Sequence, residues 1–151
     1  MSTTTRLPEK LAEIVDLLTL VDRAERIDLL IGIADRFRGV PSEIAEAPYA
    51  DEHKVPACES EAYVWARRQD DGTPKFYFAV ENPQGISAMA MAVILDESLS
   101  GVDPVQVAAV PQDLVYEIFG RELSMGKSMG LMGMVAMVKH FAKRLAAGGG
   151  A

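Results

Sequence analysis

Cysteine and histidine are scarce in this chain, which has one cysteine and two histidines among its 151 residues. A single cysteine cannot form a disulfide within the chain. Zinc sites take three or four nitrogen or sulfur ligands, and Cys58, His53 and His140 show no such motif. Nothing in the pattern therefore calls for a metal, and we expect both histidine side chains to be solvated.

Long apolar runs and clusters of positive charge are also missing. No stretch reaches the roughly 18 to 20 apolar residues that cross a bilayer, and the opening MSTTTRLPEK lacks the apolar core of a signal peptide. The formal net charge is -7 and the pI is about 4.8. Nucleic acids and anionic membranes select clustered Lys and Arg, so neither is an expected partner. We expect a protein of the reducing cytoplasm.

Apolar residues make up 49% of the chain and charged residues 25%, which is typical of a globular domain. This content is enough for one core, so we expect a single domain over residues 7–146. The polar and glycine-rich ends, residues 1–6 and 147–151, are expected to be disordered.

Helical periodicity of apolar residues recurs along the chain. It predicts helices over residues 7–21, 22–37, 84–95, 105–109, 112–119 and 127–146. The second helix should begin at an Asp22 cap and bury Ile27, Leu30, Ile31, Ala34 and Phe37. The third should bury Ile86, Met89, Ala90, Val93 and Ile94. The last should bury Leu131, Met134, Val135, Val138, Phe141, Ala142 and Leu145.

Two segments rich in β-branched and aromatic residues, 60–68 and 75–81, are separated by the turn sequence DDGTP. They predict a β-hairpin. The order of elements indicates an α+β fold, in which helices cover one face of a small antiparallel sheet. Residues 38–57 contain three prolines and little periodicity, so they predict a long irregular loop that leads to Cys58.

Two further patterns have weak functional interpretations. The GKS at residues 126–128 resembles a phosphate loop, but five residues rather than four separate Gly120 from Gly126, and the preceding segment is helical in pattern. We interpret it as a chance match. Five methionines could suggest a soft metal site, although at helical spacing they favour flexible core packing. They are Met125, Met129, Met132, Met134 and Met137.

From the residues alone, Cys58 has two interpretations. Free cysteines are often buried and inert, which favours a core role. However, Cys58 ends an irregular loop, Pro56 stiffens its approach, and no helical stripe explains it. Tyr63 and Trp65 are equally open: they belong to a strand covered on both faces, or they form an apolar wall near the cysteine.

The segment HKVPACESEAYVW, residues 53–65, resembles the active-site segment of the SufE family, the sulfur-acceptor proteins of iron–sulfur cluster assembly. One branch of that family reads His-basic-Val-Pro-acidic-Cys-Gln-Ser/Thr, followed by an apolar, aromatic strand. The residues that match are His53, Val55, Pro56, Cys58 and Ser60, with Tyr63 and Trp65 at aromatic positions.

Three other segments are similar to the family and come in the same order: IADRF at residues 33–37, ENPQGISAMAMAVI at 81–94 and LSMGKSMGL at 123–131. The resemblance therefore extends from about Leu7 to Leu145. The departures are Ala57, Glu59, Met125 and Lys127. Lys127 stands where the family has arginine, and it keeps the charge but lacks the planar fork of donors.

The resemblance implies a SufE/IscU-like fold and a sulfur carrier rather than a stand-alone enzyme. Cys58 would take persulfide sulfur from a SufS-like cysteine desulfurase and pass it to a SufBCD-like iron–sulfur scaffold. The protein would need no cofactor, because pyridoxal phosphate belongs to the desulfurase, and it would be a monomer or weak homodimer. The residues implied to support the loop or a sheltering pocket are His53, Val55, Pro56, Ser60, Tyr63, Trp65 and Lys127.

Two other functions stay open at this point. Cys58 and His53 could serve a cysteine hydrolase or transferase, although no orienting Asn or Asp is obvious. Alternatively, the chain could be a non-catalytic interaction module whose acidic surface binds a partner and whose cysteine is inert.

Overall fold

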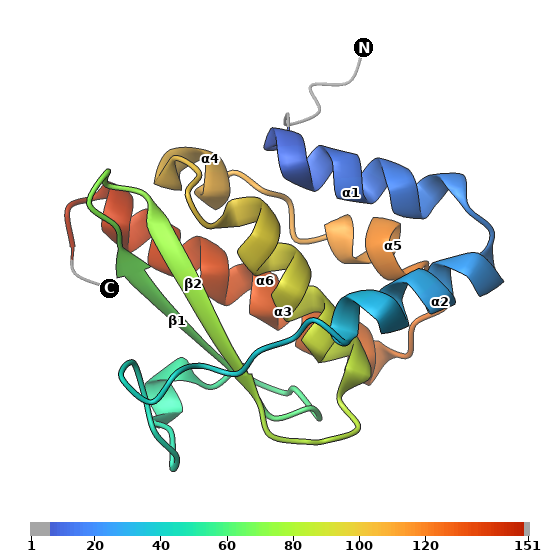
Figure 1. Cartoon of the computed structure of the whole chain (residues 1–151), viewed down its shortest axis with the longest axis horizontal. Helices are drawn as coiled ribbons and strands as arrows, with labels where there is room; N and C mark the ends of the chain where they lie inside the picture. The colour runs from blue at the N-terminus through green and yellow to red at the C-terminus, as the bar shows by residue number, and fades with distance from the viewer. Residues whose placement is uncertain (1–6, 150–151) are drawn as a thin grey trace.

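A computed structural model describes residues 7–149 (Figure 1). This part of the chain contains six α-helices, one 3-10 turn and one two-stranded sheet. In chain order the elements are α1 (Glu9–Leu20), α2 (Arg23–Ala34), η1 (Asp51–His53), β1 (Ala62–Arg68), β2 (Pro74–Val80), α3 (Ile86–Leu99), α4 (Pro104–Ala108), α5 (Leu114–Phe119) and α6 (Met125–Ala146).

Strands β1 and β2 form the expected antiparallel hairpin, with Ala62 opposite Val80 and Arg68 opposite Pro74. The turn between them needs Gly72, whose φ of 87° is costly for other residues. Side chains alternate between the two faces of a strand. As a result, Ala62, Val64 and Ala66 of β1 join the main core, while Tyr63 and Trp65 join a second cluster.

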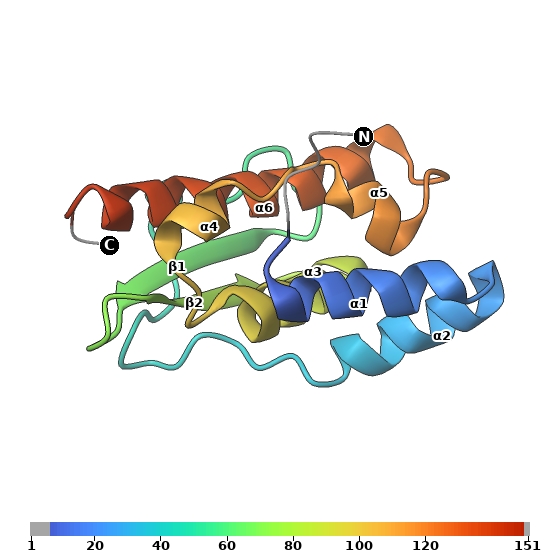
Figure 2. The ribbon, with the colours of Figure 1, turned by 90° about the horizontal axis from the view of Figure 1, so that it is seen from above.

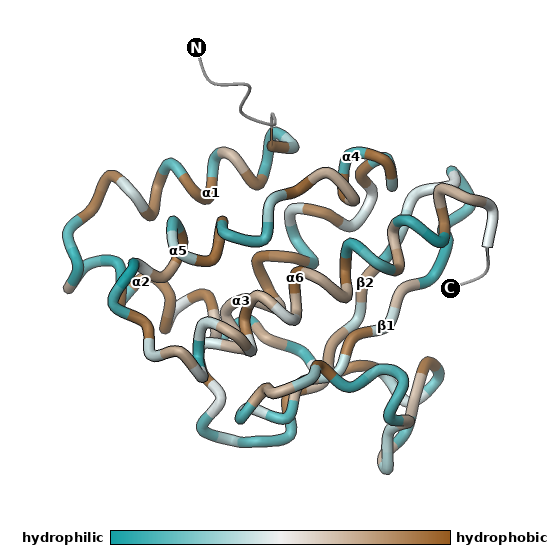
Figure 3. Tube along the Cα trace, turned by 180° about the vertical axis from the view of Figure 1, so that it is seen from behind, coloured by the Kyte–Doolittle hydropathy of each residue, from teal (hydrophilic) through white to brown (hydrophobic). Residues whose placement is uncertain are grey.

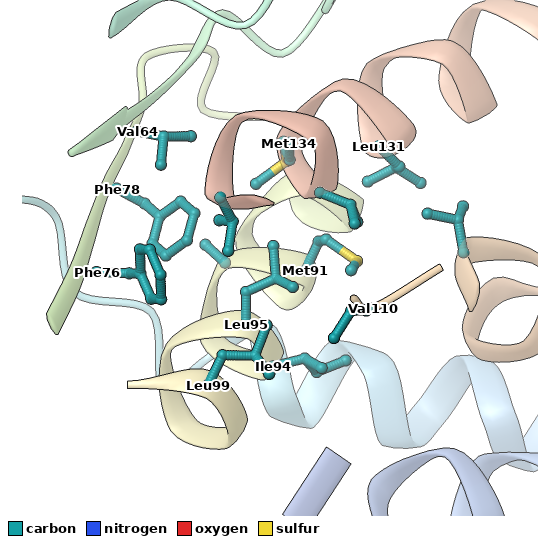
Figure 4. Packing of buried hydrophobic residues seen from close by; sticks show 14 of the residues in the cluster. Val64, Phe76, Phe78, Met91, Ile94, Leu95, Leu99, Val110, Leu131 and Met134 are labelled. Carbon is teal, nitrogen blue, oxygen red and sulfur yellow. The ribbon is translucent and has the colours of Figure 1, made fainter. Parts of the chain in front are cut away.

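Helices α3 and α6 cover one face of the hairpin and form the main core with it. Phe76, Phe78 and Val64 of the sheet pack toward Met91 and Met134 of the two helices (Figure 4). Helix α3 is buried along most of its length, and it contains long hydrophobic stretches at the centre of the molecule (Figure 3). This helix connects α1 and α2 to the rest of the fold.

The irregular segment after α2 covers the opposite face of the hairpin, which we call the reverse face. Figure 2 shows this segment on one side of the sheet and α6 on the other. The residues of this segment that pack on Tyr63 and Trp65 are Val40, Ile44, Ala45 and Tyr49. The backbone N–H of Val40 also donates a hydrogen bond to the carbonyl of Phe78 at 2.8 Å.

The periodicity of the last helix predicted its buried stripe correctly, since all seven residues of that stripe are buried in α6. The Asp22 cap is also confirmed, because its side chain accepts a hydrogen bond from the backbone N–H of Glu25. The helices lie close to their expected positions, and the α+β arrangement is as expected.

Two expectations about burial are wrong. Ile27 and Ile31 of α2 are each 47% exposed and Ile86 of α3 is 43% exposed, because α2 packs on α3 through Leu30 and Ala34. Among the five methionines, only Met134 is fully buried, whereas Met125 and Met129 are 78% and 50% exposed. The three isoleucines and the two exposed methionines therefore present apolar surface that no other part of residues 7–149 covers.

The GKS sequence does not form a phosphate loop. Gly120 ends α5, whereas Gly126 and Ser128 lie in the first turn of α6, where the Ser128 hydroxyl donates to the carbonyl of Met125. Within residues 7–149, none of the helices combines the length and apolar character that a membrane span requires.

A bidentate ion pair connects the end of α2 to α3. The guanidinium of Arg36 donates from Nη2 and Nε to the two carboxylate oxygens of Glu97, at 2.8 and 3.2 Å. The hydrogen bonds to Arg36 lower the pKa of Glu97 below its usual value of 4.5. Because the folded state favours the ionised carboxylate, the pair stabilises the fold above the unfolded pKa and loses this effect as the pH falls through the folded pKa.

We therefore predict that Glu97→Gln lowers the free energy of unfolding at pH 7 by no more than about 1 kcal/mol, as for other exposed ion pairs. The difference from wild type should vanish once the pH falls below the lowered, folded-state pKa of Glu97, because the carboxylate is then protonated. Thermal unfolding followed by circular dichroism across this range would measure it. The control is Glu13→Gln, at an exposed carboxylate with no ion pair among residues 7–149. An equal effect of both variants would contradict the prediction.

Candidate functional site

Cys58 lies in a short loop, residues 55–61, that we call the cysteine loop. At its start, the N–H of Val55 donates to the carbonyl of Ala62 at 2.9 Å, and further along the N–H of Glu61 donates to the carbonyl of Cys58 at 3.0 Å. Asn82, just after β2, donates from its backbone to the carbonyl of Ser60 and from its side chain to that of Glu59. The half-buried Cys58 is therefore held in a tight turn between fixed ends.

Two residues of the cysteine loop have a left-handed backbone although neither is glycine. Ala57 has a φ of 56° and Glu61 a φ of 54°. This conformation costs about 1–2 kcal/mol for an L-residue, so the surrounding hydrogen bonds must enforce it. Residues strained in this way concentrate at functional sites, and here they lie on both sides of Cys58.

Three glycines of α6 form the surface on which the cysteine loop rests. Gly126, Gly130 and Gly133 lie on one side of the helix, at a spacing of four and three residues. A β-carbon at Gly130 would lie 3.3 Å from both the Cα and the Sγ of Cys58, and one at Gly133 would lie 2.8 Å from Val55 Cγ1. A side chain at Gly130 would need Cys58 to shift by a few tenths of an ångström, and one at Gly133 would also need Val55 to move. Figure 2 shows the green segment before β1 lying against α6.

The two glutamates beside Cys58 point in different directions. A β-carbon at Gly126 would lie 2.9 Å from Oε1 of Glu59, which places this carboxylate at the first turn of α6, where the helix dipole favours negative charge. The charge of Glu61 instead acts on Tyr63, whose ring packs on the reverse face. Burial raises the pKa of Tyr63 there, and the carboxylates of Glu81 and Glu61 raise it further. Glu61 therefore lines neither hollow beside Cys58, whereas Glu59 lines both of them.

A pocket of about 200 Å³ opens beside the sulfur, between the cysteine loop, the start of α3 and the first two turns of α6. Its polar walls include Ser60, Asn82, Ser87 and Lys127, and its apolar walls include Ala88 and Leu131. A second, shallow hollow on the other side of Cys58 is bounded by Asp51, Lys54 and Pro56. The thiol can therefore be reached from outside, and a small pocket lies next to it.

His53 supports the cysteine loop from a distance rather than facing the sulfur. Its Nδ1 donates to the carbonyl of Val64 at 2.8 Å, and its ring stacks on Trp65 with centroids 5.2 Å apart. The expectation of a solvated His53 is therefore wrong, although His140 is exposed as expected. His53 lines neither hollow beside Cys58.

Tyr63 and Trp65 do not line the pocket, contrary to expectation. The cysteine loop and the pocket lie on the α6 side of the hairpin, whereas these two rings pack on the reverse face with Tyr49. They can support the loop only indirectly, through the stacking of Trp65 on His53. The interpretation of β1 as a strand covered on both faces is confirmed.

The other expected site residues are closer to the sulfur. Val55 is fully buried at the base of the loop and Pro56 is exposed on its surface. Ser60 packs against Gly85, at which a β-carbon would lie 2.9 Å from Ser60 Cβ. Lys127 is exposed at the pocket wall. Across the described residues, no three His, Cys, Asp or Glu side chains cluster in a way that could hold a metal ion.

Comparison with known proteins agrees with this geometry. The family model of SufE, described as an Fe-S metabolism associated domain, matches residues 12–142. The chain belongs to the SufE family. The resemblance seen around Cys58 is thus confirmed, and the SufE family connects this chain with Fe-S metabolism.

Individual relatives of the SufE family are similar over almost the whole chain. Two uncharacterized SufE-like proteins of Mycobacterium tuberculosis, from strains CDC 1551 and H37Rv, are each 26% identical over 145 residues, which covers 96% of this chain and 97% of the relative. The solution structure of a hypothetical protein from Thermus thermophilus superposes with a TM-score of 0.73 at 21% identity, over 94% of this chain and 99% of that one. The SufE-like fold is confirmed.

The contact between Gly130 and the thiol leads to a prediction. Gly130→Ala should push the cysteine loop away from α6 and expose Cys58, because the methyl group would lie 3.3 Å from the Cα and Sγ of Cys58, closer than ordinary van der Waals contact. We expect alkylation of Cys58 by iodoacetamide to become several-fold faster, and the free energy of unfolding to fall by about 1–3 kcal/mol.

Gly32→Ala is the matched control, because a β-carbon at this helical glycine meets no atom within 4 Å. It should raise stability by up to about 1 kcal/mol and leave the alkylation rate unchanged. If Gly130→Ala behaved like this control in both measurements, the close approach of the loop to α6 would be refuted.

Proposed function

We propose that this protein is a sulfur carrier, which accepts persulfide sulfur on Cys58 from a cysteine desulfurase and passes it to an iron–sulfur scaffold. The observation that carries the proposal is the setting of Cys58. In a SufE-family chain, the only cysteine is half-buried in a strained turn, rests against glycines of α6 and borders a small pocket.

The transfer is an exchange between sulfur atoms. The Cys58 thiolate attacks the outer sulfur of the donor persulfide; a new S–S bond forms on Cys58, and the donor S–S bond breaks. The proton of the persulfide travels with the transferred sulfur, and the donor cysteine leaves as a thiolate. No net oxidation occurs, so the step needs no redox cofactor. Attack on the outer sulfur by the next acceptor returns Cys58 to its thiolate.

The absence of a second cysteine suits this role. A neighbouring thiol would attack the persulfide and release its sulfur while forming a disulfide, and this chain has only Cys58. The pocket can hold the outer sulfur, with Ser60, Asn82 and Ser87 as neutral polar neighbours. Lys127 adds a positive charge for the persulfide anion, and Glu59 adds a carboxylate to the same walls. Lys127 would then partly replace the arginine found in the family.

The partners follow from this chemistry. The donor is a pyridoxal-phosphate cysteine desulfurase of the SufS type, so the carrier itself needs no cofactor, and the acceptor is a SufBCD-like scaffold. A reducing cytoplasm would keep Cys58 a free thiol. The hydrolase alternative receives less support, because His53 is committed to Val64 and Trp65 rather than to the sulfur. An interaction module with an inert cysteine would keep its function in a Cys58→Ala variant.

We predict that the protein gains one sulfur atom on Cys58 when it is incubated with cysteine and its desulfurase. Intact-mass spectrometry would detect the gain and peptide mapping would place it. Cys58→Ser is a clean control, because it leaves no cysteine in the chain. Equal sulfur addition to this variant, or none to the wild type, would refute the proposed function. The wild-type protein should also increase the turnover of the desulfurase.

A further inference from the structure

A second hollow, which we call the groove, adjoins the cysteine site. It has a volume of about 440 Å³ and lies between α2, the start of α3 and the connection from α5 to α6, which come together on the right of Figure 1. Its apolar walls include Ile27 and Ile31 of α2, Ile86 of α3, and Phe119 and Leu123 of the connection.

The groove exposes apolar side chains that the sequence pattern assigned to the core. Ile27, Ile31 and Ile86 are each more than two-fifths exposed, and they are three of the eight large apolar residues that are exposed among residues 7–149. Ile27 and Ile31 are one turn apart on α2, so they present a continuous edge. Clustered exposed apolar residues with a polar rim mark interaction sites.

The rim of the groove is positive although the chain is acidic. Arg23, Arg26 and Lys127 border it, and Glu122 is its only carboxylate, loosely paired with Arg23 at 3.8 Å. Arg26 is fixed in place, since its Nε donates to the carbonyl of Leu18 at 3.0 Å. With a net charge of -7 on the whole chain, this local excess of cations selects an occupant that carries carboxylates.

The groove and the cysteine pocket share two walls. Ser87 and Lys127 line both. A segment seated in the groove therefore ends beside the pocket, where an incoming persulfide must arrive. A second copy of this chain in the same place would obstruct the pocket without bringing a persulfide, because its own Cys58 is the acceptor.

We propose that the groove docks an acidic, apolar segment of the sulfur donor, with one or two bulky apolar side chains between the isoleucines and flanking Asp or Glu on the arginines. This inference rests on the proposed function and adds the surface through which the donor approaches. The donor reaches Cys58 from the side of α2, and affinity comes from the groove rather than from the thiol.

The test replaces Ile31 by aspartate. Ile31→Asp puts a carboxylate on the exposed edge of the groove, so it opposes both the apolar and the acidic features of the donor. We expect the rate of sulfur transfer from the desulfurase persulfide to Cys58, at subsaturating protein, to fall at least about tenfold. Val105→Asp is the matched control, on α4, with 64% exposure and outside the groove. Its rate should stay within about twofold of wild type.

A small-molecule donor separates docking from chemistry. Glutathione persulfide needs no groove, so Ile31→Asp should accept its sulfur at the wild-type rate. Loss of both transfers in the same proportion would place the defect at Cys58 and overturn the docking role. Arg23→Glu, on the exposed rim, gives a second variant that does not touch the core; it should slow only the transfer from the desulfurase.

The remaining outcomes identify other occupants. Wild-type rates from the desulfurase in both groove variants would overturn the proposal. Dissociation of a wild-type dimer by Ile31→Asp, with transfer unchanged, would assign the groove to a second copy of this chain, and a defect only in onward transfer would assign it to the scaffold. Failure of wild-type Cys58 to accept sulfur at all would instead refute the proposed function.

Discussion

The close approach of the cysteine loop to α6 is the contact on which the candidate site depends. Gly126, Gly130 and Gly133 lack the β-carbons that would separate the loop from the helix. Because these β-carbons are absent, the backbone of Cys58 can lie against α6. The helix then half-buries the sulfur and forms one wall of its pocket. The close approach also places the carboxylate of Glu59 at the first turn of the helix, where the helix dipole favours negative charge, although Glu59 still lines the pocket beside the thiol.

The base of this arrangement is fixed more firmly than its tip. His53 joins the segment before the loop to β1 through Val64, and its ring is stacked on Trp65. Val55 is buried and bonded to β1 on the other side. The glycine contacts are van der Waals contacts, each worth about 0.1–0.2 kcal/mol per atom pair. The contacts of the loop with α6 are therefore individually weak, and the hydrogen bonds from Asn82 to Glu59 and Ser60 hold the loop in place.

The elements of the fold could be predicted because they follow from local patterns. The hairpin has a strong turn sequence, and the stripe of α6 has a clean helical period. Burial on the surface of the fold was harder to predict. The period of α2 marks Ile27 and Ile31 as an apolar face, but a period cannot say whether another element covers that face. In this chain α3 packs only against the adjacent side of α2, where Leu30 and Ala34 are buried.

The motif led from the sequence to Cys58 as the candidate sulfur, and that role stays a prediction. The surroundings of Cys58 were harder to predict, because the alternation of Tyr63 and Trp65 with smaller residues fixes only that the two faces of β1 differ. Which face meets the cysteine depends on the segment after α2, which covers the reverse face and leaves the α6 side to the loop. The glycine surface of α6 under the cysteine loop, formed by Gly126, Gly130 and Gly133, was not predicted either. Its signal was the recurrence of glycine on one side of a helix, where glycine normally lowers stability.

The wall shared by the groove and the pocket connects binding to chemistry. Lys127 is exposed there, so water screens its charge from the sulfur beside it. A donor segment seated in the groove would displace that water, and the attraction between the ammonium and a thiolate or persulfide anion would increase as the local dielectric falls. Under the proposed function, this coupling would make sulfur transfer to Cys58 faster from a donor that fills the groove than from one that does not.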